Sequence, residues 1–209
     1  MKFVSLISSG IDSPVATYLI SDTATQIVLL HFDITPFSDD RENKKFSEIA
    51  KHLDKKTKCR FKNIIVPHGE NLEVFRQKCE NRFTCIFCKR MMYRIARIIA
   101  EKNSCQALIT GDSLGQVASQ TLQNIKVIEE VSSLPVLRPL IGYDKEEIVD
   151  IAKEIGSFKL SIQNAKKCAA TPSKPATRAK IKDIVEEEKK IDVKKMVDKS
   201  VEKARLVTF

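Results

Sequence analysis

SSGIDSP, residues 8–14, stands between an apolar run at Phe3–Ile7 and a helical pattern at Ser13–Ser21. Gly10 permits a backbone conformation closed to other residues, and Pro14 suits the first turn of a helix. The free N–H groups and the positive dipole end of such a helix favour an anion. The stretch therefore predicts a phosphate site, although an ordinary capped helix start would give the same local pattern.

The stretch differs from two common phosphate-binding motifs. It has no Gly-x-x-x-x-Gly-Lys-Ser/Thr sequence, and it does not match the Gly-x-Gly-x-x-Gly dinucleotide fingerprint. It does carry a carboxylate, Asp12, where a phosphate would bind. A carboxylate beside a phosphate requires a bridging cation, and Mg²⁺ is the expected one. We therefore expect Asp12 to act through the metal rather than as a general base.

Strand-like and helix-like segments alternate along the chain. Alternation of this kind indicates βαβ units and a parallel sheet with helices on its faces, a Rossmann-like α/β fold. Ligands of such sheets bind at the carboxyl ends of the strands. The expected strands are Phe3–Ile7, Gln26–Phe32, Asn63–Val66, Ala107–Thr110 and Leu134–Leu137, and the expected helices are Ser13–Ser21, Arg41–Lys56, Asn71–Cys79, Lys89–Lys102 and Lys145–Ile155, the last capped by Asp144.

The C-terminal part of the chain changes character. Ser161–Lys180 contains two prolines and many small residues and is expected to be an ordered loop or linker. Ile181–Arg205 is a charged helical pattern, which fits either a solvated amphipathic helix packed on the sheet or an RNA-contacting face. We expect a main domain over residues 1–180 and a helical extension over residues 181–209 that packs on it.

Composition narrows the class of protein. The chain has 209 residues with a formal net charge of +9, which fits either a lysine-rich solvated surface or a polyanionic partner such as RNA. No apolar run is long enough to span a membrane. Six cysteines without a secretory signal predict a reducing cytoplasm, where thiols serve metals or catalysis more often than disulfides.

The cysteines fall into two groups. Cys85 and Cys88 form a C-x₂-C pair, and Cys168 lies in the late loop; Cys59, Cys79 and Cys105 are expected to be packing residues. Three kinds of site remain open for the first group: zinc, which needs a fourth ligand, a redox dithiol at a helix N-terminus, or an Fe–S cluster with Cys168 as the third ligand.

Several longer motifs occur in a fixed order: CKRMMYRIARIIAEK (88–102), ALITGDSLGQVASQTLQNI (107–125), PVLRPLIGYDKEEIVDIAKEIG (135–156) and KPATRAK (174–180). Together with SSGIDS they resemble the catalytic domain of tRNA 4-thiouridine synthetases, which belong to the PP-loop ATP pyrophosphatases. The resemblance covers about residues 3–180. One departure is Ser9, which stands where the SGGxDS loop of these enzymes has its second glycine.

The resemblance implies an ATP site with the base against His31 and Phe32 and with the phosphates along the SSGIDS loop. It implies Asp12 and Cys168 as the catalytic residues. The implied ATP-binding residues are Leu6, Ile7, Ser8, Ser9, Gly10, Ser13, His31, Phe32, Lys89, Gly111 and Gln120.

The resemblance also bears on the cysteines. Archaeal members pair a C-x₂-C with the later catalytic cysteine to hold an Fe–S cluster, which implies Cys85, Cys88 and Cys168 as ligands. A persulfide or disulfide mechanism without a cluster, and zinc, are the alternatives. A second departure is the sequence NAKK at residues 164–167, where acidic residues are usual; it raises the positive charge beside Cys168.

Most members of this family carry an RNA-binding region with a THUMP domain before the first strand, and many bacterial members end in a rhodanese domain. Neither is expected here, so tRNA would be bound by the basic surface or by a separate subunit. The implied function is adenylation of a uridine in tRNA and replacement of its O4 by sulfur. The alternatives are another RNA, a small thiamine-type precursor, or a nucleotide- or RNA-binding subunit of a split enzyme. The sequence leaves open the sulfur donor and whether the chain is a homodimer.

Overall fold

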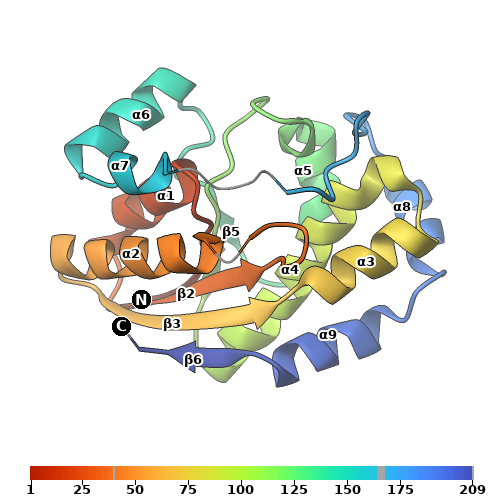
Figure 1. Cartoon of the computed structure of the whole chain (residues 1–209), viewed down its shortest axis with the longest axis horizontal. Helices are drawn as coiled ribbons and strands as arrows, with labels where there is room; N and C mark the ends of the chain where they lie inside the picture. Colours follow the sequence, from red (N-terminus) through yellow and green to blue (C-terminus); the bar gives the residue numbers. More distant parts are fainter. Residues whose placement is uncertain (40, 164–167, 209) are drawn as a thin grey trace.

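The computed structural model describes residues 1–39, 41–163 and 168–208, and its centre is a twisted sheet of six strands (Figure 1). The strand order is β5-β4-β1-β2-β3-β6, and every pairing is parallel except β3 with β6. The Rossmann-like fold class predicted from the sequence is confirmed. The strands are β1 (Lys2–Leu6), β2 (Gln26–Asp33), β3 (Arg60–Pro67), β4 (Ala107–Ile109), β5 (Val136–Leu137) and β6 (Arg205–Val207).

Helices cover both faces of the sheet (Figure 1), and β2 shows how the sequence sets this up. Val28 and Leu30 pack into the cluster of one face, and Ile27 and Leu29 pack into that of the other. A strand buried on both faces has a continuous apolar sequence rather than an alternating one. The helices are α1 (Asp12–Ser21), α2 (Arg41–Lys56), α3 (Gly69–Lys78), α4 (Thr84–Lys102), α5 (Leu122–Glu129), α6 (Lys145–Glu154), α7 (Phe158–Ser161), α8 (Ile181–Glu188) and α9 (Val193–Glu202), with short 3₁₀ turns at Asn81–Phe83 and Ala118–Gln120.

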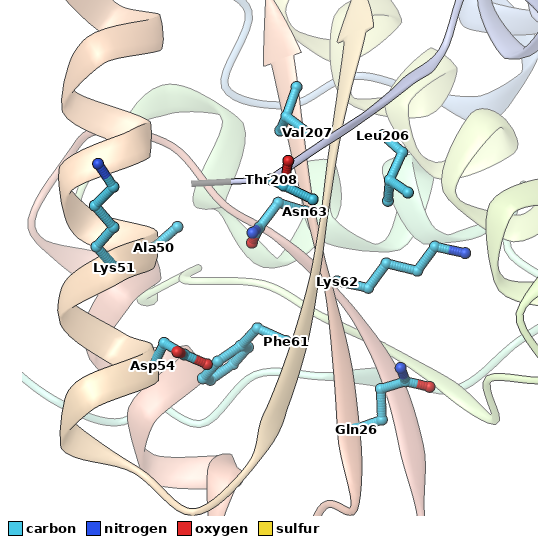
Figure 2. Close-up of a pocket in the computed structure, with 10 residues that line it drawn as sticks. All are labelled: Gln26, Ala50, Lys51, Asp54, Phe61, Lys62, Asn63, Leu206, Val207 and Thr208. Atoms are coloured by element: carbon cyan, nitrogen blue, oxygen red, sulfur yellow. The ribbon is translucent and has the colours of Figure 1, made fainter.

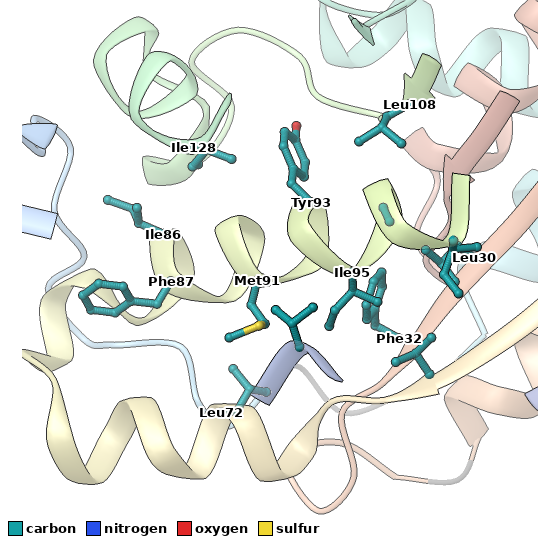
Figure 3. Packing of buried hydrophobic residues seen from close by; sticks show 14 of the residues in the cluster. Leu30, Phe32, Leu72, Ile86, Phe87, Met91, Tyr93, Ile95, Leu108 and Ile128 are labelled. Atoms are coloured by element: carbon teal, nitrogen blue, oxygen red, sulfur yellow. The ribbon is translucent and has the colours of Figure 1, made fainter. Parts of the chain in front are cut away.

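Helix α4 forms the centre of the larger core. Met91 and Ile95 are fully buried against Leu30 of β2 and Leu72 of α3 (Figure 3). Burying one such side chain contributes about 1.5–3 kcal/mol of transfer free energy. The apolar face of α4 therefore holds it rigidly beside the sheet, and its remaining faces are available for polar and sulfur-bearing side chains.

Several predicted boundaries shift in the structure. Helix α4 begins at Thr84 rather than Lys89, so the C-x₂-C lies within its first turns rather than before it. Asp144 caps α6 as predicted, through a capping box with Glu147. The elements α5, α7 and β6 were not predicted.

The C-terminal segment consists of two helices and a strand rather than one long helix. Val197 of α9 is buried in the core cluster that includes α4, and β6 pairs with β3 and forms the edge of the sheet. Glu188 at the end of α8 accepts hydrogen bonds from Arg90 and Arg94 of α4, and Arg90 is only 1% exposed. A buried two-arginine contact of this kind ties α8 to the core.

Candidate nucleotide and cysteine sites

A pocket of about 250 Å³ opens where the strand order reverses, between β1 and β4. Such a switch point is where open α/β sheets bind ligands. The SSGIDS loop forms one wall, and helix α4 together with the segment after β4 forms the other. The lining residues are Leu6, Ser8, Gly10, Asp12, Ser13, Lys89, Met92, Tyr93, Thr110, Gly111, Asp112 and Gln120.

Hydrogen bonds within the loop hold its shape. The Ser13 hydroxyl accepts from the Ser8 backbone N–H at 2.8 Å, and the Gly10 N–H donates to the Ser8 hydroxyl at 3.2 Å. Gly10 does not use the left-handed conformation that glycine permits, because its φ is not positive. A Cβ at Gly10 would instead lie 3.3 Å from the Ser8 hydroxyl, so glycine serves here to keep the loop open.

Gly111 has the tighter steric requirement. A Cβ built there would lie 2.7 Å from the backbone nitrogen of Ser13 and 2.9 Å from the carbonyl carbon of Asp12. The chain after β4 therefore packs directly against the N-terminus of α1. This contact closes the floor of the pocket.

Asp12 faces the pocket and forms an ion pair with Lys145, at 2.5 Å between Oδ1 and Nζ. Lys145 begins α6 and comes from a segment more than a hundred residues away. The sequence analysis missed it, although it lies in the quoted motif 135–156. A cation at Asp12 would have to share this carboxylate with Lys145 or replace it.

Lys89 enters the same pocket from α4 and forms an ion pair with Asp112 at 2.7 Å. Burial alone would raise the pKa of Asp112, but Lys89 and hydrogen bonds from Thr110 and Gln120 outweigh it and lower that pKa. Asp112 is therefore ionised and fixes the Lys89 ammonium at the pocket wall. Asp112 was not singled out from the sequence, although the TGD sequence that contains it was.

A second pocket of about 180 Å³ adjoins the first and shares Leu6, Ser8 and Met92 with it. Its walls include His31, Phe32 and Glu42 and are mostly apolar. Such a chamber beside a phosphate-binding loop suits a flat aromatic base. The structure thus brings all eleven predicted ATP-binding residues to the loop or to these two pockets.

His31 is buried in the wall of the second pocket. Its ring stacks on Phe46 with 4.7 Å between centroids, and Nδ1 lies 3.1 Å from the Ile7 carbonyl oxygen. Burial lowers the pKa of His31, so the ring is neutral. Its Nε2 is buried, and Asn43 of α2 is the side chain that favours a proton on the ring by hydrogen bonding.

Ser9, the departure from the family loop, is accommodated without strain. Its φ is not positive, and its side chain is buried and donates a hydrogen bond to Glu42 of α2. The serine side chain therefore points away from the first pocket, whose lining does not include Ser9.

Cys85, Cys88 and Cys168 form a second site, which we call the cysteine site. Burial raises the pKa of both Cys85 and Cys88, and the charge of Cys168 raises each further. All three thiols are free and partly buried, whereas Cys59, Cys79 and Cys105 are buried. The structure therefore brings together the three cysteines singled out from the sequence.

Metal binding at the cysteine site is not preformed. Over residues 1–39, 41–163 and 168–208, no three His, Cys, Asp or Glu side chains are grouped so as to hold one metal ion. Thiolates are suitable Fe–S ligands, and Cys85, Cys88 and Cys168 are the residues that would hold a cluster. The NAKK sequence before Cys168 lies outside the described residues.

Another hollow, of about 460 Å³, lies between α2 and the sheet edge formed by β3 and β6 (Figure 2). Its lining includes Gln26, the first residue of β2, and Phe61 near the start of β3. It thus lies toward the amino ends of these strands, away from the SSGIDS loop. None of the predicted site residues lines it.

The fold, the loop at the switch point and the paired pockets define a PP-loop domain of the α/β nucleotide-binding class. The chain belongs to the family described as thiamine biosynthesis protein (ThiI), whose sequence pattern matches residues 1–193. No helix in the described part of the chain has the length and apolar character needed to cross a membrane.

Curated relatives carry the name probable tRNA sulfurtransferase. The protein from Methanosarcina mazei is 37% identical over 99% of this chain and 51% of its own length. That from Acetivibrio thermocellus is 41% identical over 100% of this chain and 53% of its own length. The chain thus spans about half the length of the curated relatives that it matches.

Solved structures agree with this assignment. A 4-thiouridine synthetase in complex with RNA and ATP superposes with a TM-score of 0.93 at 33% identity, covering 99% of this chain and 55% of that one. NMN synthetase from Francisella tularensis gives a TM-score of 0.57 at 15% identity, over 94% and 75% of the two chains, and shares the fold alone.

Proposed function

We propose that this chain is the catalytic domain of an ATP-dependent tRNA sulfurtransferase that makes 4-thiouridine. One observation carries the proposal: helix α4 presents Lys89 to the nucleotide pocket and, from the adjacent turn, Cys85 and Cys88 to the cysteine site. Activation by ATP and transfer of sulfur require two such sites side by side. The likeness to an ATP-bound 4-thiouridine synthetase supports the assignment of ATP to the pockets.

In the first half-reaction ATP binds with its base in the pocket beside His31 and its phosphates along the SSGIDS loop. Uracil O4 attacks the α-phosphorus, and the bond to the β-phosphate breaks and releases pyrophosphate. Lys89 and the N–H groups at the start of α1 stabilise the developing negative charge. Mg²⁺ would neutralise phosphate charge when bound, and Asp12 is the residue placed to hold it.

In the second half-reaction the outer sulfur of a persulfide on Cys168 attacks C4 of the adenylated base and displaces AMP. A thiolate of Cys85 or Cys88 then attacks Sγ of Cys168 and breaks the S–S bond. This releases the thiolated base and leaves a cysteine disulfide, which an external thiol reductant must reduce before the next cycle. The protein contributes mainly orientation, because both reactions need their partners held within contact distance. An Fe–S cluster on Cys85, Cys88 and Cys168 is the alternative sulfur carrier predicted from the sequence. A persulfide on Cys168 uses the same three cysteines without a bound group, and it is the mechanism that we propose here.

The proposed substrate is a tRNA, which would bind the basic surface of a chain with a formal net charge of +9. Phosphate contacts made by such a surface release counterions, so affinity should fall steeply as salt rises. A separate RNA-binding subunit, a homodimer and a cytoplasmic location remain predictions within the same proposal.

The test measures pyrophosphate release and 4-thiouridine formation with ATP, tRNA and a persulfide donor. Asp12→Ala should abolish both. Cys168→Ala should keep tRNA-dependent pyrophosphate release and lose thiolation, and Cys105→Ala serves as the matched control because Cys105 lies outside the site. If Cys168→Ala loses both activities while remaining folded, the assigned division of roles is wrong.

A second candidate keeps the chemistry and changes the acceptor. The family description names thiamine biosynthesis, which favours a small-molecule sulfur acceptor. Pyrophosphate release that needs a small acceptor and is indifferent to tRNA would support this candidate. Absence of pyrophosphate release with either acceptor, despite nucleotide binding, would instead indicate a binding subunit.

A further inference from the structure

A buried histidine outside the predicted site contacts the cysteine site. His68 precedes α3, is completely buried, and lies edge-on to Phe32 with 5.4 Å between ring centroids. Its Nε2 lies 3.3 Å from Sγ of Cys88, and its Nδ1 lies 3.1 Å from Nδ2 of Asn71. Asn71 in turn lies 2.9 Å from the hydroxyl of Ser200 on α9. A continuous polar chain therefore runs from α9 to Cys88.

The direction of each hydrogen bond in this series of polar groups can be worked out from Ser200, at its outer end. The Met196 carbonyl can only accept, so the single hydroxyl proton of Ser200 is donated to it at 2.8 Å. The Ser200 oxygen must then accept, and Asn71 supplies a proton from its amide nitrogen. The other proton on that nitrogen points to Nδ1 of His68, which must accept as well. The proton of the neutral imidazole is left on Nε2, directed at Cys88.

The hydrogen bonds require a neutral ring. Nδ1 faces the N–H donor of Asn71 and therefore carries no proton, and Asn71 offers no charge that would favour the imidazolium. A neutral imidazole has one donor and one acceptor nitrogen, and its partner on one side fixes the role of the other.

We propose that His68 is a positioning residue of the cysteine site: Asn71 holds its ring as the Nε2–H tautomer, and that N–H donates a hydrogen bond to the sulfur of Cys88. The proposal deepens the proposed sulfurtransferase function and rests on it for its catalytic consequence. Its structural half, the tautomer, is independent of any activity.

The consequence is that the sulfur of Cys88 has an imidazole N–H as its hydrogen-bond donor, although Cys85 lies on the same helix. A hydrogen bond donated to sulfur favours its electron-rich forms, the thiolate or a thiolate bound to a metal. It also restricts the side-chain rotation of Cys88. Partners of this kind orient a reacting group and typically affect activity by about 10–100-fold.

The first experiment determines the tautomer directly. The chain has three histidines, so ¹⁵N-imidazole spectra are simple, and His68→Gln assigns the His68 signals by their loss. We expect the wild type to carry its His68 proton on Nε2. Asn71→Asp should move it to Nδ1, because a carboxylate accepts where the amide donated. A wild-type ring protonated on Nδ1, or on both nitrogens, would overturn the proposal.

The second experiment separates positioning from folding. His68→Phe fills the space without a donor, whereas His68→Gln offers an amide N–H near the position of Nε2. Thiolation should fall by about 10–100-fold in His68→Phe and be largely restored in His68→Gln, with pyrophosphate release unchanged in both. Equal thiolation by folded His68→Phe and wild type would refute the catalytic half.

These outcomes remain distinct from failure of the proposed function. If the wild type does not thiolate tRNA, the proposed function fails while the spectra still decide the tautomer. If His68→Phe does not fold, Asn71→Asp keeps the ring and reverses its polarity, so its thiolation rate gives the same comparison.

Discussion

The nucleotide pocket and the cysteine site share helix α4, yet their polar groups are satisfied in different ways. In the nucleotide pocket, charges are paired with one another: Lys89 with Asp112 and Lys145 with Asp12. At the cysteine site, the partner of Cys88 is a neutral histidine set by a chain of neutral groups. Ion pairs can be exchanged for an anionic ligand and its metal. The neutral, buried series Ser200–Asn71–His68, which we call the relay, holds one geometry whatever is bound nearby.

The difference indicates which substitutions should affect each site. The nucleotide pocket depends on side chains that a ligand reorganises, so substitutions there should affect the binding and activation of ATP. The cysteine site depends on α9 for the orientation of Asn71, so substitutions in the C-terminal helices should affect sulfur transfer. Substitutions at five positions test this comparison.

Lys89→Met should have the largest effect. It removes a cation from the phosphate region and leaves buried Asp112 without its 2.7 Å partner. Loss of one preorganised charge-stabilising group costs on the order of 10²–10³-fold in rate, and we expect that loss in pyrophosphate release. Arg97→Met on the exposed face of α4 is the control. A Lys89→Met protein with normal pyrophosphate release would remove Lys89 from the first half-reaction.

Glu188→Gln should destabilise the protein by about 3 kcal/mol, because it removes the charge shared by Arg90 and Arg94 and leaves buried Arg90 with only the more exposed Glu130 as its ion-pair partner. Arg90 is 1% exposed and Glu188 only 11%. The measurement is the free energy of unfolding in denaturant. Glu186→Gln on the same helix is the matched control, since the Glu186–Lys189 pair is exposed and such pairs contribute about 0–1 kcal/mol.

The same Glu188→Gln variant also tests the comparison itself. At a temperature where it stays folded, it should lose more thiolation than pyrophosphate release. The reason is that α9, which follows α8, carries Ser200 next to Asn71, whereas no residue of either helix lines the nucleotide pocket. Equal loss of both activities would show that the two sites are not independently supported.

Gly111→Ala should weaken nucleotide binding by about 10–100-fold, which corresponds to an overpacking cost of about 1–3 kcal/mol. The added Cβ would lie 2.7 Å from the backbone nitrogen of Ser13, and a backbone atom cannot rotate away. Gly142→Ala is the matched control, because a Cβ there meets nothing within 4 Å. Titration of ATP by calorimetry measures the change, and equal affinities in the two variants would contradict the contact.

His31→Phe should flatten the dependence of stability on pH. Burial lowers the pKa of His31 below its ordinary value of 6.5, so below that pH the unfolded chain binds a proton that the folded chain excludes. Stability therefore falls as pH decreases through 6.5. Phenylalanine removes this contribution, worth at most about 1.4 kcal/mol per pH unit. Unfolding free energies at pH 7.5 and 5.5 measure it, and identical slopes would show that His31 is accessible to protons.

Much of the fold could be predicted because its strands are local apolar runs buried on both faces of a parallel sheet. Strand β6 could not, because Arg205–Val207 is short and mostly exposed and becomes a strand only by pairing with β3. The break between α8 and α9 was missed because the charged pattern continues through it. The start of α4 was placed too late because the residues around Cys85 and Cys88 do not show the strong helical periodicity of the residues that follow them.

The candidate site also has one part that could be predicted from the sequence and one part that could not. The SSGIDS loop is local in sequence, so its place between a strand and the start of a helix could be predicted from residues 8–14 alone. The partners of its polar groups are not local: Lys145 reaches Asp12 from α6, and Glu42 reaches Ser9 from α2. His68 carried no signal at all, because a single histidine after a strand becomes informative only when the fold places Cys88 beside it.

Ser9→Gly should have the smallest effect, and it restores the glycine found in the family loop. Because Ser9 has no positive φ and points toward Glu42, we expect ATP affinity to change by less than about threefold, or under about 0.7 kcal/mol. Any residual change should come from Glu42, whose carboxylate loses a donor at the wall of the base pocket. A large gain in affinity would show instead that the serine holds the backbone away from the phosphates. The loop would then belong with the groups that a bound nucleotide must reorganise, as Lys89 and Lys145 do.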